Sequence, residues 1–218
     1  MKLRFILVLF LLSYLNCGYS QENIVINDLG LQAIMDQVDR KANKLCEYIM
    51  NIGSSRSLLS LQEKDIIIRN EVPRLFWEYK QRKMTTSSGA NGTIIKTKSM
   101  ENYFINLLRQ SNQPTNREVR YELFYDKVFA DENIRNLDSW ERLPDRDNCR
   151  VWRQTIRFTQ AYYIINCDLN RNYDFVVGNR VVKEEVDRKY MYIYLIERKD
   201  DLKKLALIGD VYMVERVQ

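Results

Sequence analysis

The spacing of apolar residues changes once along this chain, and that change limits the fold more than any other feature. Between Leu31 and Ile52, apolar residues recur every three or four positions, as one face of a helix requires. From Glu118 to Tyr125, apolar and polar residues mostly alternate, as a half-buried strand requires. This order predicts an α+β domain, with N-terminal helices packed on one face of an antiparallel sheet.

Helix boundaries are marked by local signals. Asp28 can cap the first helix, and Gly53 stands where a C-terminal glycine is common. The stretch "SLQE" at 60–63 has the capping-box pattern and predicts the start of a second helix. Pro73 either kinks that helix or begins a new one. Ser99 predicts the start of a third helix.

The sheet is expected mainly between residues 118 and 217, as a meander of about seven antiparallel strands. The stretch 126–148 is interpreted as acidic and irregular. Three turns are expected beyond it. They are Thr159-Gln160 between strands 151–158 and 161–167, Gly178-Asn179, and Lys199–Asp201 before the last strand.

The N-terminus has the composition of an export signal. Lys2 and Arg4 precede an apolar run of 11 residues, Phe5 to Leu15. A membrane-spanning helix needs about 20 apolar residues, so we expect no membrane span. Gly18 and Ser20 are small residues at the positions that a signal peptidase reads. Residues 1–20 are therefore predicted to be a signal peptide.

The expected product is one exported domain, residues 21–218, with a helical lead-in to about residue 83. Its predicted location is periplasmic or extracellular. The alternative is a lipoprotein anchored at Cys17. A lipobox usually has leucine three residues before the cysteine and a small residue directly before it, where this chain has Tyr14 and Asn16.

Composition excludes several function classes. Removal of Lys2 and Arg4 lowers the net charge from +5 to +3, which is too small to favour a nucleic-acid partner. The chain contains 0 histidines, which excludes histidine-containing zinc sites and histidine-based catalytic triads. No phosphate-binding glycine motif or serine nucleophile elbow is present. We therefore name no catalytic residue, metal or cofactor.

Three cysteines remain after the predicted cleavage: Cys46, Cys149 and Cys167. A turn at Thr159-Gln160 would bring Cys149 and Cys167 within about one residue of facing each other. An exported protein folds where disulfides persist, so these two are predicted to bond and leave Cys46 as a buried thiol. A two-residue loop would instead place Cys149 opposite Asp168.

Three tyrosines are the candidate binding residues. The spacing of Tyr190, Tyr192 and Tyr194 places them on one face of a strand. Met191, Ile193 and Leu195 then form the other face, which we expect to be the core. Tyrosines suit surfaces that are partly apolar and partly wet. The tyrosines form either a binding surface or ordinary cross-strand packing.

The order of elements resembles the NTF2-like (cystatin-like) superfamily, in which N-terminal helices pack into a strongly bent antiparallel sheet. The stretch "LALIGDVYMVE", 205–215, is similar in character to the closing strands of that superfamily. The "YSQE" junction at 19–22 and the overall style also resemble exported proteins of Bacteroides-type gut bacteria. The superfamily includes enzymes and binding modules, so the resemblance implies a fold and not a function.

Two functions are compatible with these patterns. The first is a non-enzymatic exported binding module that engages an envelope protein or a small ligand. The alternative is a histidine-independent NTF2-like cleft enzyme that uses Asp or Glu with Tyr. A buried carboxylate beside a tyrosine in a deep pocket would favour the enzyme, and a flat aromatic face rimmed by charge would favour the module.

Overall fold

A computed structural model describes residues 24–88, 94–112, 117–170 and 175–217. The helices are α2 (Asp28–Gly53), α3 (Leu61–Ile66), α4 (Met100–Ser111) and α5 (Lys127–Arg135). A π-helical turn, Ile67–Glu71, and short 3₁₀ turns at Val72–Leu75, Tyr79–Gln81 and Leu137–Ser139 connect them to their neighbours. The strands are β1 (Lys83–Ser88), β2 (Ile94–Ser99), β3 (Arg117–Tyr125), β4 (Glu141–Arg146), β5 (Cys149–Asn170), β6 (Phe175–Arg198) and β7 (Lys204–Val217).

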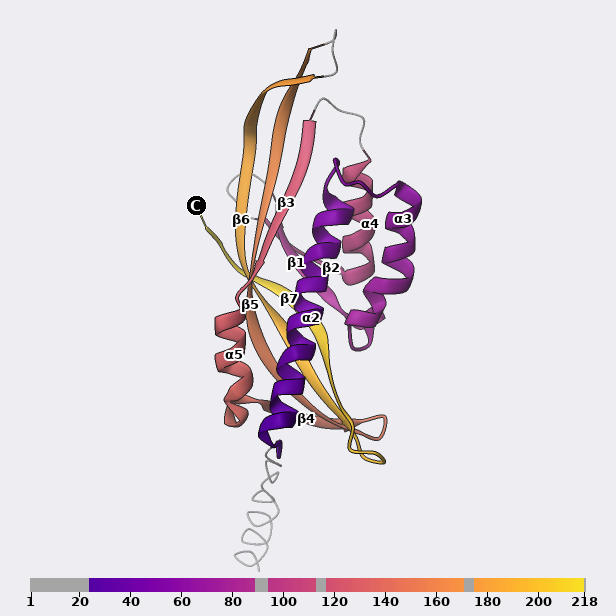
Figure 1. Cartoon of the computed structure of the whole chain (residues 1–218), viewed down its shortest axis with the longest axis vertical. Helices are drawn as coiled ribbons and strands as arrows, with labels where there is room; N and C mark the ends of the chain where they lie inside the picture. Colours follow the sequence, from indigo (N-terminus) through magenta and orange to yellow (C-terminus); the bar gives the residue numbers. More distant parts are fainter. Residues whose placement is uncertain (1–23, 89–93, 113–116, 171–174, 218) are drawn as a thin grey trace, which may run out of the picture.

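The strands form one seven-stranded sheet in an α+β fold, as the change of apolar spacing predicts. Its order is β2-β1-β7-β6-β5-β3, and β4 pairs with the other part of β5. All strand pairs are antiparallel except β1 with β7, which meet in parallel at Met84 and Val211. Strands β3, β5 and β6 extend beyond the helices at one end of the molecule (Figure 1). No helix within the described residues is both long and apolar enough to cross a membrane.

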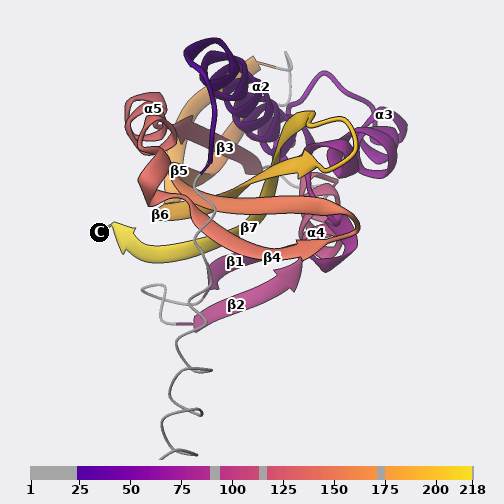
Figure 2. The same cartoon turned by 90° about the horizontal axis from the view of Figure 1, so that it is seen from below.

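Helix α2 lies along the sheet and supplies much of the core. Its apolar stripe packs against β3, β7 and α4, and it shares one core with Met191, Ile193 and Leu195 of β6, which are at most 1% exposed. The expected aliphatic core face of this strand is therefore confirmed. Figure 2 shows α2 and α5 next to each other above the strands, with the β1–β2 hairpin at the far edge of the curled sheet. The buried residues of α2 are Ile34, Met35, Val38, Ala42, Leu45, Cys46, Tyr48, Ile49, Ile52 and Gly53.

Most helix starts agree with the sequence signals. Ser60 and Glu63 form the predicted capping box, and the Ser99 hydroxyl accepts the amide hydrogen of Asn102 at the start of α4. The first helix is capped by Asn27 and not by Asp28, because the Asn27 side chain accepts from the Gly30 amide. Pro73 lies in a 3₁₀ turn, in which its missing N–H costs little.

The predicted turn at Thr159-Gln160 is wrong, because β5 is one continuous strand. Here β5 lies between two partners: Thr159 pairs with Phe124 of β3 on one side and with Arg188 of β6 on the other. A turn at this point would remove the partner of both strands. Neither residue is among the usual turn formers, Gly, Pro, Asn, Asp and Ser.

The predicted turn at Gly178-Asn179 is also wrong, because β6 continues through both residues. The β5–β6 register shifts between the pairs Cys167–Asn179 and Leu169–Val176. Glycine inside a strand often marks such a bulge, so the glycine indicated an irregular pairing and not a chain reversal. The last predicted turn is confirmed, since residues 199–201 connect β6 to β7. The stretch expected to be irregular contains α5 and β4.

Gly209 in β7 allows a tyrosine of the neighbouring strand to lie flat against the backbone. A Cβ atom at position 209 would lie 2.1 Å from Cε2 of Tyr194 and 3.1 Å from Cβ of Tyr192. Tyr194 is only 5% exposed, and its ring lies 4.8 Å from the Trp77 ring. The Tyr194 ring therefore occupies the space that a side chain at position 209 would need.

We expect Gly209→Ala to lower the free energy of unfolding by about 1–3 kcal/mol, because the Tyr194 ring must move away from its packed position. Urea unfolding measures this change. The same substitution in a Tyr194→Ala background should cost much less, because the obstructing ring is absent. An equal cost in both backgrounds would contradict the steric explanation.

Candidate functional site

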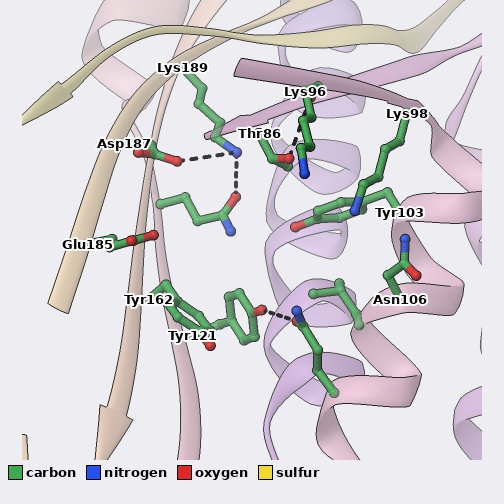
Figure 3. Close-up of a pocket in the computed structure, with 13 residues that line it drawn as sticks. Thr86, Lys96, Lys98, Tyr103, Asn106, Tyr121, Tyr162, Glu185, Asp187 and Lys189 are labelled. Carbon is green, nitrogen blue, oxygen red and sulfur yellow. Dashed lines mark hydrogen bonds and ion pairs between the residues drawn. The ribbon is translucent and has the colours of Figure 1, made fainter. Parts of the chain in front are cut away.

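A cavity of ≈ 250 Å³ lies between the β5–β6 part of the sheet and the layer formed by β2 and α4 (Figure 3). Its walls are almost entirely polar or aromatic. They are formed by Thr86, Lys96, Lys98, Tyr103, Asn106, Leu107, Gln110, Tyr121, Gln160, Tyr162, Glu185, Asp187 and Lys189.

The polar floor continues the core face of β6. Side chains two residues apart on a strand share a face, so Glu185, Asp187 and Lys189 lie on the same side as Met191 and Ile193. Across the strand pair, Glu185 is opposite Tyr162 and Asp187 is opposite Gln160. The core-facing side of the sheet thus changes from aliphatic to charged within one strand.

Lys189 is the most unusual residue of the floor. It is 0% exposed, and its Nζ donates a hydrogen bond of 2.9 Å to Oε1 of Gln160. The nearest carboxylate oxygen, Oδ2 of Asp187, is 4.0 Å away. Loss of hydration lowers the pKa of Lys189 to about 8, although Asp187 opposes part of this change. A buried lysine with a strongly lowered pKa is a recognised mark of a functional site.

The two carboxylates of the floor are held by Arg216 of β7. Its Nε lies 3.1 Å from Oδ1 of Asp187, and its Nη2 lies 2.9 Å from Oε2 of Glu185. All three side chains are at most 14% exposed. Because one guanidinium binds both acids, neither carboxylate is placed as a free proton acceptor.

The hydroxyl of Tyr103 points into the cavity from α4 (Figure 3). Tyr103 is 4% exposed, and its hydroxyl has no hydrogen-bond partner among the described residues. Burial raises the pKa of Tyr103, and the Gln160 side chain offsets a part of that rise, because it lies close to the hydroxyl although outside hydrogen-bond geometry. A buried hydroxyl without a partner is costly. Its oxygen has less than 1 Å² of accessible surface, so a bound molecule would reach it only after a small movement of the neighbouring side chains.

Tyr121 forms the wall next to the end of α2. Its hydroxyl donates a hydrogen bond of 2.8 Å to Oε1 of Gln110, and its ring lies 5.1 Å from that of Tyr162. A Cβ atom on Gly53 would lie 2.6 Å from Cδ2 of Tyr121. Gly53 is the last residue of α2, and its role is to leave room for this ring.

Two lysines line the opposite wall. Lys96 and Lys98 lie two residues apart on β2, and Figure 3 shows both side chains directed toward the Tyr103 ring. Within the described part of the chain, neither ammonium has a carboxylate within 4.0 Å. The cavity therefore has a positively charged wall on β2 and a charge-paired wall on β6.

The predicted binding tyrosines lie on the other face of β6 and do not line this cavity. Tyr194 is buried and accepts a hydrogen bond from Arg82, whereas Tyr190 and Tyr192 are half-buried. The Arg153 guanidinium lies 4.4 Å from the Tyr192 ring centroid. The three residues share a face, as predicted, and their role as a binding surface stays a prediction.

The predicted disulfide is wrong. Cys149 and Cys167 lie near opposite ends of the same strand, β5, and not on two strands of a hairpin. Eighteen residues of strand span on the order of 60 Å when extended, far beyond the Cα separation below about 7 Å that a disulfide allows. Cys149 is a free thiol, and Cys46 is a free, buried thiol in α2, as expected. Of Cys167, only the backbone position is described.

The cavity residues were missed by the sequence analysis, although a signal was present. The alternation that assigned Met191, Ile193 and Leu195 to the core also assigns Lys189 and Asp187 to it. Charged residues that share the core-facing side of a strand with its apolar residues indicate a polar pocket or buried ion pairs. No cluster of three or more acidic or cysteine side chains in the described ranges is placed to hold a metal ion.

Comparison of the chain with protein-family models, curated proteins and solved structures gives no match.

The lowered pKa of Lys189 predicts a specific pH dependence of stability. The unfolded chain keeps this proton up to about pH 10.5, whereas the folded protein releases it near pH 8. The burial cost is therefore complete below pH 8 and is relieved as the pH rises toward 10.5. Relative to Lys189→Met, the wild type should gain about 2–3 kcal/mol of unfolding free energy between pH 7 and pH 10.

Denaturant unfolding at several pH values measures this difference. Lys203→Met, at an exposed position, is the matched control, for which the difference should stay nearly constant with pH. A constant difference for Lys189→Met as well would show that the Lys189 ammonium is not desolvated in the folded protein.

The two described thiols should differ in reactivity. Burial raises the pKa of Cys46 to about 12, whereas Cys149 is partly exposed. We expect iodoacetamide at pH 8 to modify Cys149 in the folded protein and Cys46 only after unfolding. Peptide mass mapping measures both. A reducible link between Cys149 and Cys167, with no adduct on Cys149 before reduction, would restore the disulfide.

Proposed function

We propose that the protein is a non-enzymatic binding module that holds a small ligand in the cavity lined by Tyr103 and Lys189. The observation that carries this proposal is the presence at the cavity of one buried polar group without a partner and one buried charge with few partners. The Tyr103 hydroxyl has no partner among the described residues, and the fully buried Lys189 ammonium makes one close hydrogen bond. A bound polar molecule would satisfy the first group and shield the charge of the second.

The size of the cavity also supports a small ligand. Its volume of ≈ 250 Å³ lies below the range of about 300–1,000 Å³ that is usual for drug-sized ligands. The walls come from β2 and α4 on one side and from β5 and β6 on the other. These are regular elements, which hold binding groups more rigidly than loops do.

The second candidate is an enzyme, because carboxylates and tyrosines do meet in this cavity. Asp187 and Glu185 lie near Tyr103 and Tyr162 in the lining. A general base must be free to accept a proton, however, and both acids are bound by Arg216. This pairing favours a binding role over acid–base catalysis.

The location and the superfamily remain part of the proposal. An exported, periplasmic or extracellular protein is proposed from residues 2–20, which lie outside the described residues. The NTF2-like relationship is supported by the layout of helices packed on a curled sheet. An envelope protein that docks on the Tyr190–Tyr194 face is a compatible additional partner.

Ligand-observed NMR with a panel of sugars, amino acids, organic acids, sugar phosphates and nucleosides tests the proposed function. We expect at least one compound to bind, and Asn106→Trp to weaken its binding at least tenfold, because Asn106 lines the cavity and the indole would fill it. Asn102→Trp is the matched control, since Asn102 is exposed on the same helix, one turn earlier.

Three outcomes would contradict the proposal. Binding that both tryptophan variants retain would place the ligand elsewhere. Conversion of a bound compound during the measurement would favour the enzyme. Absence of binding by every compound of the panel would remove the cavity as a ligand site.

A further inference from the structure

We propose that the ligand of this cavity is a small organic acid, whose anionic oxygens lie between Lys96, Lys98 and the Tyr103 hydroxyl. This inference rests on the proposed function and adds the chemical class of the ligand. Carboxylates and phosphate monoesters share the required chemistry, namely two or more oxygens that accept hydrogen bonds and carry negative charge.

The balance of charge around the cavity is the first argument. Lys96, Lys98, Lys189 and Arg216 carry positive charge there, and Glu185 and Asp187 carry negative charge. The excess is therefore positive. An excess of one charge within a cleft attracts small ions of the opposite charge and raises their local concentration.

The positions of the charges are the second argument. Both acids belong to the β6 wall, where Arg216 binds them. Lys96 and Lys98 belong to the β2 wall and have no carboxylate within 4.0 Å among the described residues. In Figure 3, the acids and these two lysines lie on opposite sides of the cavity. An anion next to β2 would contact the free cations and stay away from the carboxylates.

Tyr103 supplies the third, independent argument. Its hydroxyl is directed into the cavity between the two walls, and it has no partner among the described residues (Figure 3). A hydroxyl can donate to an anionic oxygen, and a charged acceptor gives a stronger hydrogen bond than a neutral one. Lys96 and Lys98 line the same cavity, so their ammonium groups can bind the other oxygens of the same acid group.

Matched pairs of acids and neutral analogues test the ligand class. Succinate is compared with succinamide, and glycerol 3-phosphate is compared with glycerol, by ligand-observed NMR at 50 mM salt. We expect at least one acid to bind at least tenfold more tightly than its neutral partner. Its affinity should fall as salt is raised, because screening weakens the attraction of exposed charges such as Lys96.

Variants identify the groups that bind the acid. Lys96→Gln and Lys98→Gln should each lower the affinity for the acid at least fivefold. Lys83 is an exposed lysine of β1 outside the lining, so Lys83→Gln should leave the affinity unchanged. Tyr103→Phe should lower the affinity for the acid at least threefold without lowering the melting temperature. If the hydroxyl were only structural, the substitution would lower the melting temperature and leave the affinity unchanged.

The outcomes separate this inference from the proposed function. If succinamide or glycerol binds as tightly as its acid, or another neutral compound binds and Asn106→Trp blocks it, the ligand class is wrong and the binding module stands. If acids bind and the lysine and Tyr103 variants bind them as tightly as the wild type does, the proposed contacts are wrong. If no compound of any class binds, both proposals fail.

Discussion

The rest of the structure depends on the packing of α2 against the sheet, and that packing is limited by length. Helix α2 has 26 residues, which span about 39 Å at 1.5 Å per residue. Strand β6 has 24 residues, which span about 80 Å at 3.3 Å per residue. The helix is therefore about half as long as the strand and cannot cover the whole sheet. The aliphatic residues of β6 belong to the same core as α2, whereas its core-facing charged residues face the cavity next to β2 and α4.

That second layer, β2 and α4, does not close completely on the sheet, and the remaining space is the cavity. Placing Lys189 at its floor costs stability, as the lowered pKa records. With an apolar residue at this position the chain would be at least as stable, since burial of a cation with one close hydrogen bond is destabilising. Such a destabilising residue is typical of sites in which the residue type is required for binding and not for folding.

The features that could be predicted best from the sequence are those that depend on neighbours along the chain. The capping box at Ser60, the Ser99 cap and the turn at residues 199–201 are local, and their residues specify them. The α+β class followed from the order of the two periodicities. The lengths of β5 and β6 could not be predicted in this way, because the partners of Thr159 and Arg188 are distant in sequence. The disulfide failed for the same reason, since it required the turn.

The cavity was harder to predict because it joins residues of β2 and α4 with residues of β5 and β6 that come at least 50 positions later. The alternation of side chains along β6 could have assigned Asp187 and Lys189 to the inner face. No local pattern, however, shows that Lys96 and Lys98 face them. Tyr103 had the spacing of an ordinary core residue in a helix, and most of its ring is indeed packed against its neighbours. Only its hydroxyl distinguishes it, and a hydroxyl without a partner is visible only in three dimensions.

The attachment of the β1–β2 hairpin has a kinetic consequence. Strand β1 meets β7 at the single residue pair Met84–Val211, whereas β5, β6 and β7 are joined along most of their length. We expect the backbone amides of the hairpin to exchange with solvent by local opening, while the amides of the central strands exchange only when the whole sheet unfolds. Lys96 and Lys98 move with the hairpin, so the rate of this opening would set how fast a molecule enters or leaves the cavity.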